Sequence, residues 1–185
     1  MTALLSLWLP ILLTAVFVFI ASSLIHMVLQ WHKPDYRQLP NEDEVRKALL
    51  NGKIGPGKYV VPYCTDMKAM QDEAMLSKYR EGPIGFLMIG NAGLPNMGKS
   101  LGSWFLVTLL VAAIAALAAV QSVGLSADSH RAAHLIGLIS LLAYGTGSVI
   151  NGIWMCVPWR SVGKHVLDAV IYATISALTF MWLWP

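Results

Sequence analysis

The sequence predicts an all-α membrane protein, with four transmembrane helices in a bundle and a small, mainly helical cytoplasmic cap between the first two helices. Of its 185 residues, 56% are hydrophobic and 12% are charged, whereas soluble domains carry about 25% charged residues. Four apolar stretches free of Lys and Arg reach the roughly 20 residues that a helix needs to cross a bilayer. We expect residues 1–185 to form a single integral membrane domain.

The first apolar stretch is expected to run from about Leu4 to Leu29. It lacks the positively charged start of a secretory signal, and it exceeds the ~7–15 apolar residues of a signal core. The run Ala21-Ser22-Ser23 resembles a cleavage site, but the helical pattern continues through it to Trp31. We therefore expect an uncleaved membrane anchor.

The segment from about residue 30 to residue 100 is expected to form the cytoplasmic cap. A first helix should begin after Asn41, with Glu44 at the capping-box position, and end near Asn51-Gly52. The sequence GPGKYVVPYC predicts a turn and a short strand, and a second amphipathic helix should run from Thr65 to Gly82. Two short helices and one strand bury too little surface for an independent catalytic domain.

The sequence GLPNMGKS, residues 93–100, matches the phosphate-loop pattern G-x-x-x-x-G-K-[ST]. That pattern binds phosphate when it joins a buried parallel strand to a helix. Here the following helix is a membrane span, and the cap is too short for several βαβ units of ~30 residues each. We expect a chance match without nucleotide binding at Gly93, Gly98, Lys99 and Ser100, and we expect Ser100 to cap the second span.

The second span is expected from about Leu101 to Val123, the third from Ala133 to Val157 and the fourth from Val166 to Trp184. Small residues on the second span allow close helix approach; they are Ala112, Ala116 and Ala119.

Lys and Arg residues are distributed unevenly between the two sides of the four spans. Twelve of the thirteen lie in the long segment or in the loop between spans three and four. Because positive charge is retained in the cytoplasm, we expect an inner (plasma) membrane protein with a cytoplasmic long loop. Both termini would then be periplasmic.

Polar residues follow one face of the fourth span. Asp168 shares this face with Lys164 and His165, and the face continues through Tyr172, Ser176 and Thr179. The third span carries a matching stripe: Gly137, Ser140, Tyr144, Ser148 and Asn151. Ionisable residues at membrane depth are costly and commonly functional. The candidate transport or polar-core residues are Asp168, Tyr172, Tyr144, Ser148 and Asn151.

The five histidines form two groups. His26, His32 and His165 are expected near the cytoplasmic face beside Asp168, where His26 and His165 could ligate a metal ion or haem, relay protons or bind a quinone. In the simpler interpretation, Asp168 pairs with Lys164 and the histidines are interfacial. His130 and His134 are four residues apart and could share a metal ion, but they supply half a site. The sequence requires no cofactor.

Three functions are compatible with these features. No strong enzyme signature occurs, so the sequence favours a protein that is not an enzyme without deciding the question. The favoured one is a non-catalytic accessory or structural subunit of a larger membrane complex, with Met67, Met70 and Met75 as a contact surface. The second is a small oligomeric transporter or channel with a polar path along spans three and four past Asp168. The third is a haem- or quinone-binding redox protein that uses His26 and His165.

The expected partners are the lipid bilayer and either other membrane-protein subunits or further copies of the chain. The net charge of +3 is too small to indicate nucleic-acid binding.

Overall fold

The structure is a computed structural model that describes residues 6–185. Four helical stretches are long and apolar enough to cross a membrane, which confirms the four long apolar helices that the sequence predicts. They are α2 (Trp8–Ser23) continued by η1 (Leu24–Leu29), α5 (Met97–Val123), α6 (Ser129–Trp154) and α7 (Trp159–Leu183). The predicted start of the first span at Leu4 lies outside the described residues.

The helices begin earlier than their apolar runs. α5 begins at Met97 instead of Leu101, α6 at Ser129 instead of Ala133 and α7 at Trp159 instead of Val166. The Asn96 side chain accepts a hydrogen bond from the Lys99 amide at 2.9 Å, so the expectation that Ser100 caps α5 is wrong. Ser100 lies inside the first turn and donates its hydroxyl to the Asn96 carbonyl. Hydropathy detects the apolar part of a helix and misses the polar turn before it.

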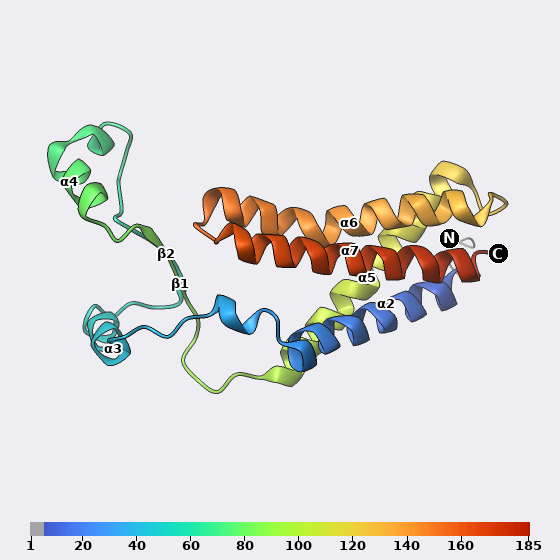
Figure 1. Ribbon diagram of the computed structural model, residues 1–185, viewed down its shortest axis with the longest axis horizontal. Coiled ribbons are helices and arrows are strands. Elements are labelled where there is room, and N and C mark those ends of the chain that lie inside the picture. Colours follow the sequence, from blue (N-terminus) through green and yellow to red (C-terminus); the bar gives the residue numbers. More distant parts are fainter. Residues whose placement is uncertain (1–5) are drawn as a thin grey trace. The chain divides into compact units, whose positions relative to one another are not determined.

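The chain divides into two compact units. The membrane unit contains the chain up to Tyr36 with residues 96–152 and 157–185. Figure 1 shows α6 and α7 running antiparallel beside each other, with α5 crossing them obliquely. Gly137 faces Ala177 and Gly145 faces Ala169; these small residues let the two backbones approach closely. Ala112, Ala116 and Ala119 of α5 are buried, as predicted.

Two apolar clusters occupy the interior of the membrane unit. The Phe180 cluster consists of Leu7, Ala115, Ala116, Ala119, Ala132, Ile136, Phe180 and Trp184. The aromatic cluster consists of Val18, Ile25 and Tyr172, with Trp31, Trp104 and Tyr144 among the side chains packed against it. The Tyr144 and Tyr172 ring centroids lie 5.4 Å apart. Tyr172 follows Asp168 by one helical turn, so the aromatic cluster leads directly to that carboxylate.

The second unit contains residues 37–95 with residues 153–156. Its elements are α3 (Glu42–Asn51), β1 (Gly57–Val61), η3 (Ala69–Gln71), α4 (Glu73–Glu81) and β2 (Gly85–Ile89). β1 pairs antiparallel with β2, which places Gly57 opposite Ile89 and Val61 opposite Gly85. The strand β2 was not part of the predicted cap.

The helix predicted from Thr65 to Gly82 is shorter than expected. The Asp66 side chain accepts hydrogen bonds from the amides of Lys68 and Ala69, both at 2.8 Å, and thereby forms a separate turn. α4 then begins after Asp72, whose backbone is extended. The residues of the phosphate-loop pattern follow β2, which has an antiparallel partner, whereas phosphate loops require a parallel sheet.

Candidate functional site: a histidine–carboxylate cluster

The first spanning helix ends in a turn that departs from α-helical geometry. η1 is a π-helix, and the Gln30 amide donates to the Ile25 carbonyl at 2.9 Å. Gln30 has a φ of 50°, a left-handed conformation that is uncommon for residues other than glycine. π-helical turns are rare and frequently occur at functional sites. After this turn, the chain brings Trp31 and His32 against α7.

Asp168 is the centre of the site and is 3% exposed. Its Oδ1 accepts a hydrogen bond from Trp31 Nε1 at 3.2 Å, and its Oδ2 accepts one from His32 Nε2 at 2.7 Å. A buried carboxylate needs such donors because it has lost its hydration. Both donors come from the segment that follows the first span.

Three imidazole rings stack beside Asp168, with His32 in the middle. The His32 ring centroid lies 4.8 Å from that of His26 and 4.4 Å from that of His165, and the planes differ by 15° and 18°. His26 Nδ1 lies 2.9 Å from the Ser22 carbonyl oxygen. Because a carbonyl only accepts hydrogen bonds, His26 Nδ1 carries a proton, and Nε2 is the free nitrogen of the neutral ring.

An ion pair between Lys164 and Asp35 forms the other side of the cluster. Lys164 Nζ donates to Asp35 Oδ1 and to the Trp31 carbonyl, both at 2.6 Å. The hydrogen bond from Lys164 holds the pKa of the Asp35 carboxyl below its usual value. Asp35 Oδ2 lies 3.5 Å from His32 Nδ1. Both atoms are buried, and neither has a hydrogen-bond partner among the described residues.

The charges of the cluster do not balance while its histidines are neutral. The cluster contains two carboxylates, those of Asp35 and Asp168, and one ammonium, that of Lys164, which leaves a net charge of −1. One bound proton makes the cluster neutral. His32 is placed to hold that proton because each of its nitrogens faces a carboxylate oxygen. The arrangement therefore offers a position for one proton between two carboxylates.

The surroundings of this charge come from every helix of the membrane unit. η1 contributes His26, and α7 contributes His165, whose Nδ1 lies 3.9 Å from Asp168 Oδ2. α5 and α6 contribute the aromatic side chains Trp104 and Tyr144, which pack beside Tyr172. The Trp104 indole donates to the Ser22 hydroxyl at 2.8 Å.

A metal ion is the alternative occupant, because ligand atoms of His26, His32 and Asp168 lie within 4.8 Å of one another. Tetrahedral bonds of about 2.0–2.2 Å would place ligand atoms about 3.4 Å apart. The 2.7 Å contact between His32 and Asp168 is a direct hydrogen bond, which a metal ion would have to break. Haem ligation by His26 and His165 meets a similar obstacle, since the His32 ring lies between them. The geometry is that of a hydrogen-bonded network of histidines and carboxylates.

The other polar candidates of the third and fourth spans lie at different depths. Tyr172 is buried, and Tyr144 is half-buried against it. Ser148 donates its hydroxyl to the Gly145 carbonyl of its own helix, and Asn151 is exposed. The inward-facing polar side chains of α6 therefore end near Tyr144. Over the last turns of this helix, Gly145 and Gly152 are the residues that face α7.

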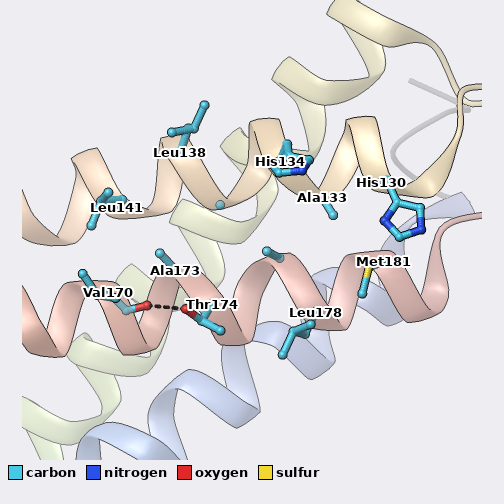
Figure 2. A pocket seen from close by; sticks show the side chains of 12 residues that line it. His130, Ala133, His134, Leu138, Leu141, Val170, Ala173, Thr174, Leu178 and Met181 are labelled. Carbon is cyan, nitrogen blue, oxygen red and sulfur yellow. Dashed lines mark hydrogen bonds between the residues drawn. The ribbon is translucent and has the colours of Figure 1, made fainter.

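His130 and His134 lie outside the cluster and line a cavity of about 330 Å³ between α6 and α7 (Figure 2). The other walls are mainly apolar and include Ala133, Leu138, Leu141, Val170, Ala173, Leu178 and Met181. Within residues 6–185, no third His, Cys, Asp or Glu joins this pair in a possible metal site. The cavity offers apolar surface with two imidazoles.

Trp31 and Asp35 are the site residues that sequence reasoning missed. Both lie in the run Trp31–Asp35, where polar and aromatic residues directly follow the end of a span. Such a run at the membrane boundary was the available signal.

No protein-family model, curated protein or solved structure matches the chain. The four apolar helices are consistent with a multi-pass membrane protein.

Proposed function

We propose that the protein is a small transporter or channel that moves protons across the inner (plasma) membrane, with the histidine–carboxylate cluster as its proton-binding site. The observation that carries this proposal is the position of His32, a 6% exposed ring between two carboxylates. Ionisable groups buried in a membrane protein are expensive and commonly mark ion or proton pathways. Packing of four apolar helices does not require them.

Proton uptake favours a closed cluster, and proton release favours an open one. With a proton on both ring nitrogens, His32 can donate to Asp168 and to Asp35. After release from Nδ1, a lone pair faces Asp35 Oδ2 across 3.5 Å, and the two repel each other. Release therefore favours separation of the Asp35 segment from α7. With a contact of this kind, the two conformations differ in their affinity for the ligand, which here is a proton.

The distribution of positive residues supports a cytoplasmic position for the cluster. Twelve of the thirteen Lys and Arg residues lie on the side where the first span ends and the fourth begins. In this orientation, the cluster exchanges protons with the cytoplasm, and both termini are periplasmic.

Proton flux into liposomes tests the proposal. The purified protein is reconstituted with an entrapped pH-sensitive dye, and a potassium diffusion potential drives proton entry. The unaltered protein should acidify the lumen, and Asp168→Asn should lose the flux while it keeps its helical content. His134→Ala is the matched control because His134 lies outside the cluster. Equal flux from the unaltered protein and Asp168→Asn would rule out the cluster as the proton site.

A second function, that of an accessory subunit, is favoured by the second unit. No residue from 37 to 95 is buried, although α3, α4 and two strands lie there. Met67 is 75% exposed and Leu94 is 97% exposed. A segment that buries so little apolar surface cannot offset the entropy cost of its own ordering. We propose that a larger membrane-protein partner covers it.

Native-gel migration of the protein, gently extracted from its host, tests the accessory function when the band is analysed by mass spectrometry. A large assembly with co-migrating proteins is expected. A variant with Met67→Ser and Met70→Ser should migrate apart from them. Migration of the unaltered protein by itself would end this second proposal and leave the proton proposal untouched.

A further inference from the structure

A layer of buried hydroxyl groups crosses the middle of the membrane unit. Each spanning helix contributes one of them, and none is more than 1% exposed. The hydroxyl layer consists of Thr14 from α2, Thr108 from α5, Ser140 from α6 and Ser176 from α7. It separates the aromatic cluster from the Phe180 cluster.

Contacts on both sides of the layer place its members at one level. Thr108 Oγ1 lies 3.4 Å from the carbonyl of Ala15, the neighbour of Thr14. Ser140 and Ser176 each lie four residues from members of both apolar clusters. On one side of them, the Tyr144 and Tyr172 rings are in contact. On the other side, Ile136 and Phe180 belong to the same buried cluster.

Several hydroxyls on this route have no partner. Thr14 Oγ1, Ser140 Oγ and the Tyr172 hydroxyl are buried without a hydrogen bond to any described residue. Thr108 and Ser176 donate to carbonyls of their own helices, which leaves their oxygen lone pairs free to accept. Unpaired polar groups are costly at membrane depth. Buried polar groups of this kind are normally satisfied by bound water.

We infer that the hydroxyl layer and the Tyr172 hydroxyl hold a file of water molecules that carries protons between the cluster and the middle of the membrane unit. This inference rests on the proposed proton transport. Each oxygen in such a file accepts one proton and passes a different proton to the next oxygen. The water molecules and side chains therefore regain their starting composition once they reorient. No other reactant is needed.

The file ends at an apolar gate. Leu7, Ile136 and Phe180 are fully buried beyond the hydroxyl layer and offer no hydrogen-bonding group. Apolar constrictions stop ion and proton movement because water is excluded from them. Proton transport to the opposite face requires this Phe180 cluster to open, so the described conformation is closed at that end.

Proton flux in the liposome assay tests the inference when the two unpartnered hydroxyls of the layer are removed. Thr14→Val and Ser140→Ala are made singly and together, and both changes nearly conserve volume. The double variant should lose at least tenfold in flux. Its melting temperature should change little, because no hydrogen bond between protein groups is lost. Thr174→Val is the matched control, since this exposed α7 hydroxyl bonds only to the Val170 carbonyl, and it should keep full flux.

The outcomes separate the water file from the proton site. Full flux from both single variants and the double variant would overturn the water file, while loss of flux in Asp168→Asn would still support the cluster. Absence of flux from the unaltered protein would overturn both. Phe180→Ala tests the gate independently: flux should rise severalfold, and an unchanged or lower flux would contradict an apolar gate at Phe180.

Discussion

His32 Nε2 and Asp168 Oδ2 lie 2.7 Å apart, although 136 positions separate their residues in the chain. The hydrogen bond joins the segment after the first span to the first half of the fourth span. Both residues are more than nine-tenths buried, so each depends on the other for the partner that water would otherwise supply. The stability and the proton affinity of the cluster are therefore coupled to the same contact.

Removal of the Asp168 carboxylate should destabilise the protein in proportion to the donors left unpaired. Asp168→Ala leaves both Trp31 Nε1 and His32 Nε2 without their hydrogen-bond acceptor. This substitution should lower the free energy of unfolding by about 3–5 kcal/mol. Asp168→Asn retains a carbonyl acceptor and should cost about 1.5–3 kcal/mol. Unfolding in detergent measures both changes. Equal stabilities of the two variants would show that the hydrogen-bonded network is not what Asp168 contributes.

Acid should weaken the contact between Asp35 and Lys164. The pKa of the Asp35 carboxyl is lowered in the folded protein by its hydrogen bond with Lys164. The stabilisation is thus complete above the unfolded pKa of about 3.9 and is lost as the pH falls through the lower folded value. The melting-temperature difference between the unaltered protein and Asp35→Asn should therefore shrink as the pH falls below about pH 4. A difference that stays unchanged below about pH 4 would be incompatible with this pair.

The middle ring of the stack should matter more for proton flux than its neighbour. His32→Phe keeps an aromatic ring between His26 and His165 but removes the nitrogens that face Asp35 and Asp168, so flux should be abolished. His26→Phe removes a ring whose Nδ1 bonds only to the Ser22 carbonyl and should leave measurable flux. The liposome assay compares the two at equal protein content. Greater loss in His26→Phe would reverse the assignment of the proton to His32.

Close packing between α6 and α7 should make one glycine of α6 sensitive to substitution. A Cβ at Gly152 would lie 2.8 Å from Cγ2 of Val162, which is buried and stiff. Gly152→Ala should therefore destabilise the protein by about 1–3 kcal/mol. Gly147 on the same helix has open space around it, and Gly147→Ala should be neutral or stabilising by up to about 1 kcal/mol. Similar effects of both substitutions would contradict the described helix contact.

The four spans could be predicted from the sequence because hydropathy depends on composition within each segment. Their starts could not, since α5 begins with a polar turn capped by Asn96. In the second unit, the side chain of Asp66 bonds to the amides of Lys68 and Ala69 and forms a turn separate from α4. Periodicity does not show this competition between a side chain and the helical backbone.

The α7 half of the site was also predictable. Lys164 and His165 fall on the same face as Asp168 because helical spacing fixes their positions. Trp31 and Asp35 reach this face only because the chain turns at Gln30 after a π-helical segment. No residue type in that segment signals the left-handed conformation of Gln30. His26 and His32 could be placed near Asp168 from the sequence, but the contacts of Trp31 and Asp35 needed the structure.

The number of protons bound by the cluster tests the central claim most directly. Indicator-dye titration in detergent compares the unaltered protein with Asp168→Asn between about pH 8 and pH 5, where imidazoles titrate. With neutral histidines, the cluster carries −1 in the unaltered protein and no net charge in the variant. The unaltered protein should therefore take up one more proton per chain than the variant over this range. Superimposable titration curves would contradict a proton site at His32 and Asp168.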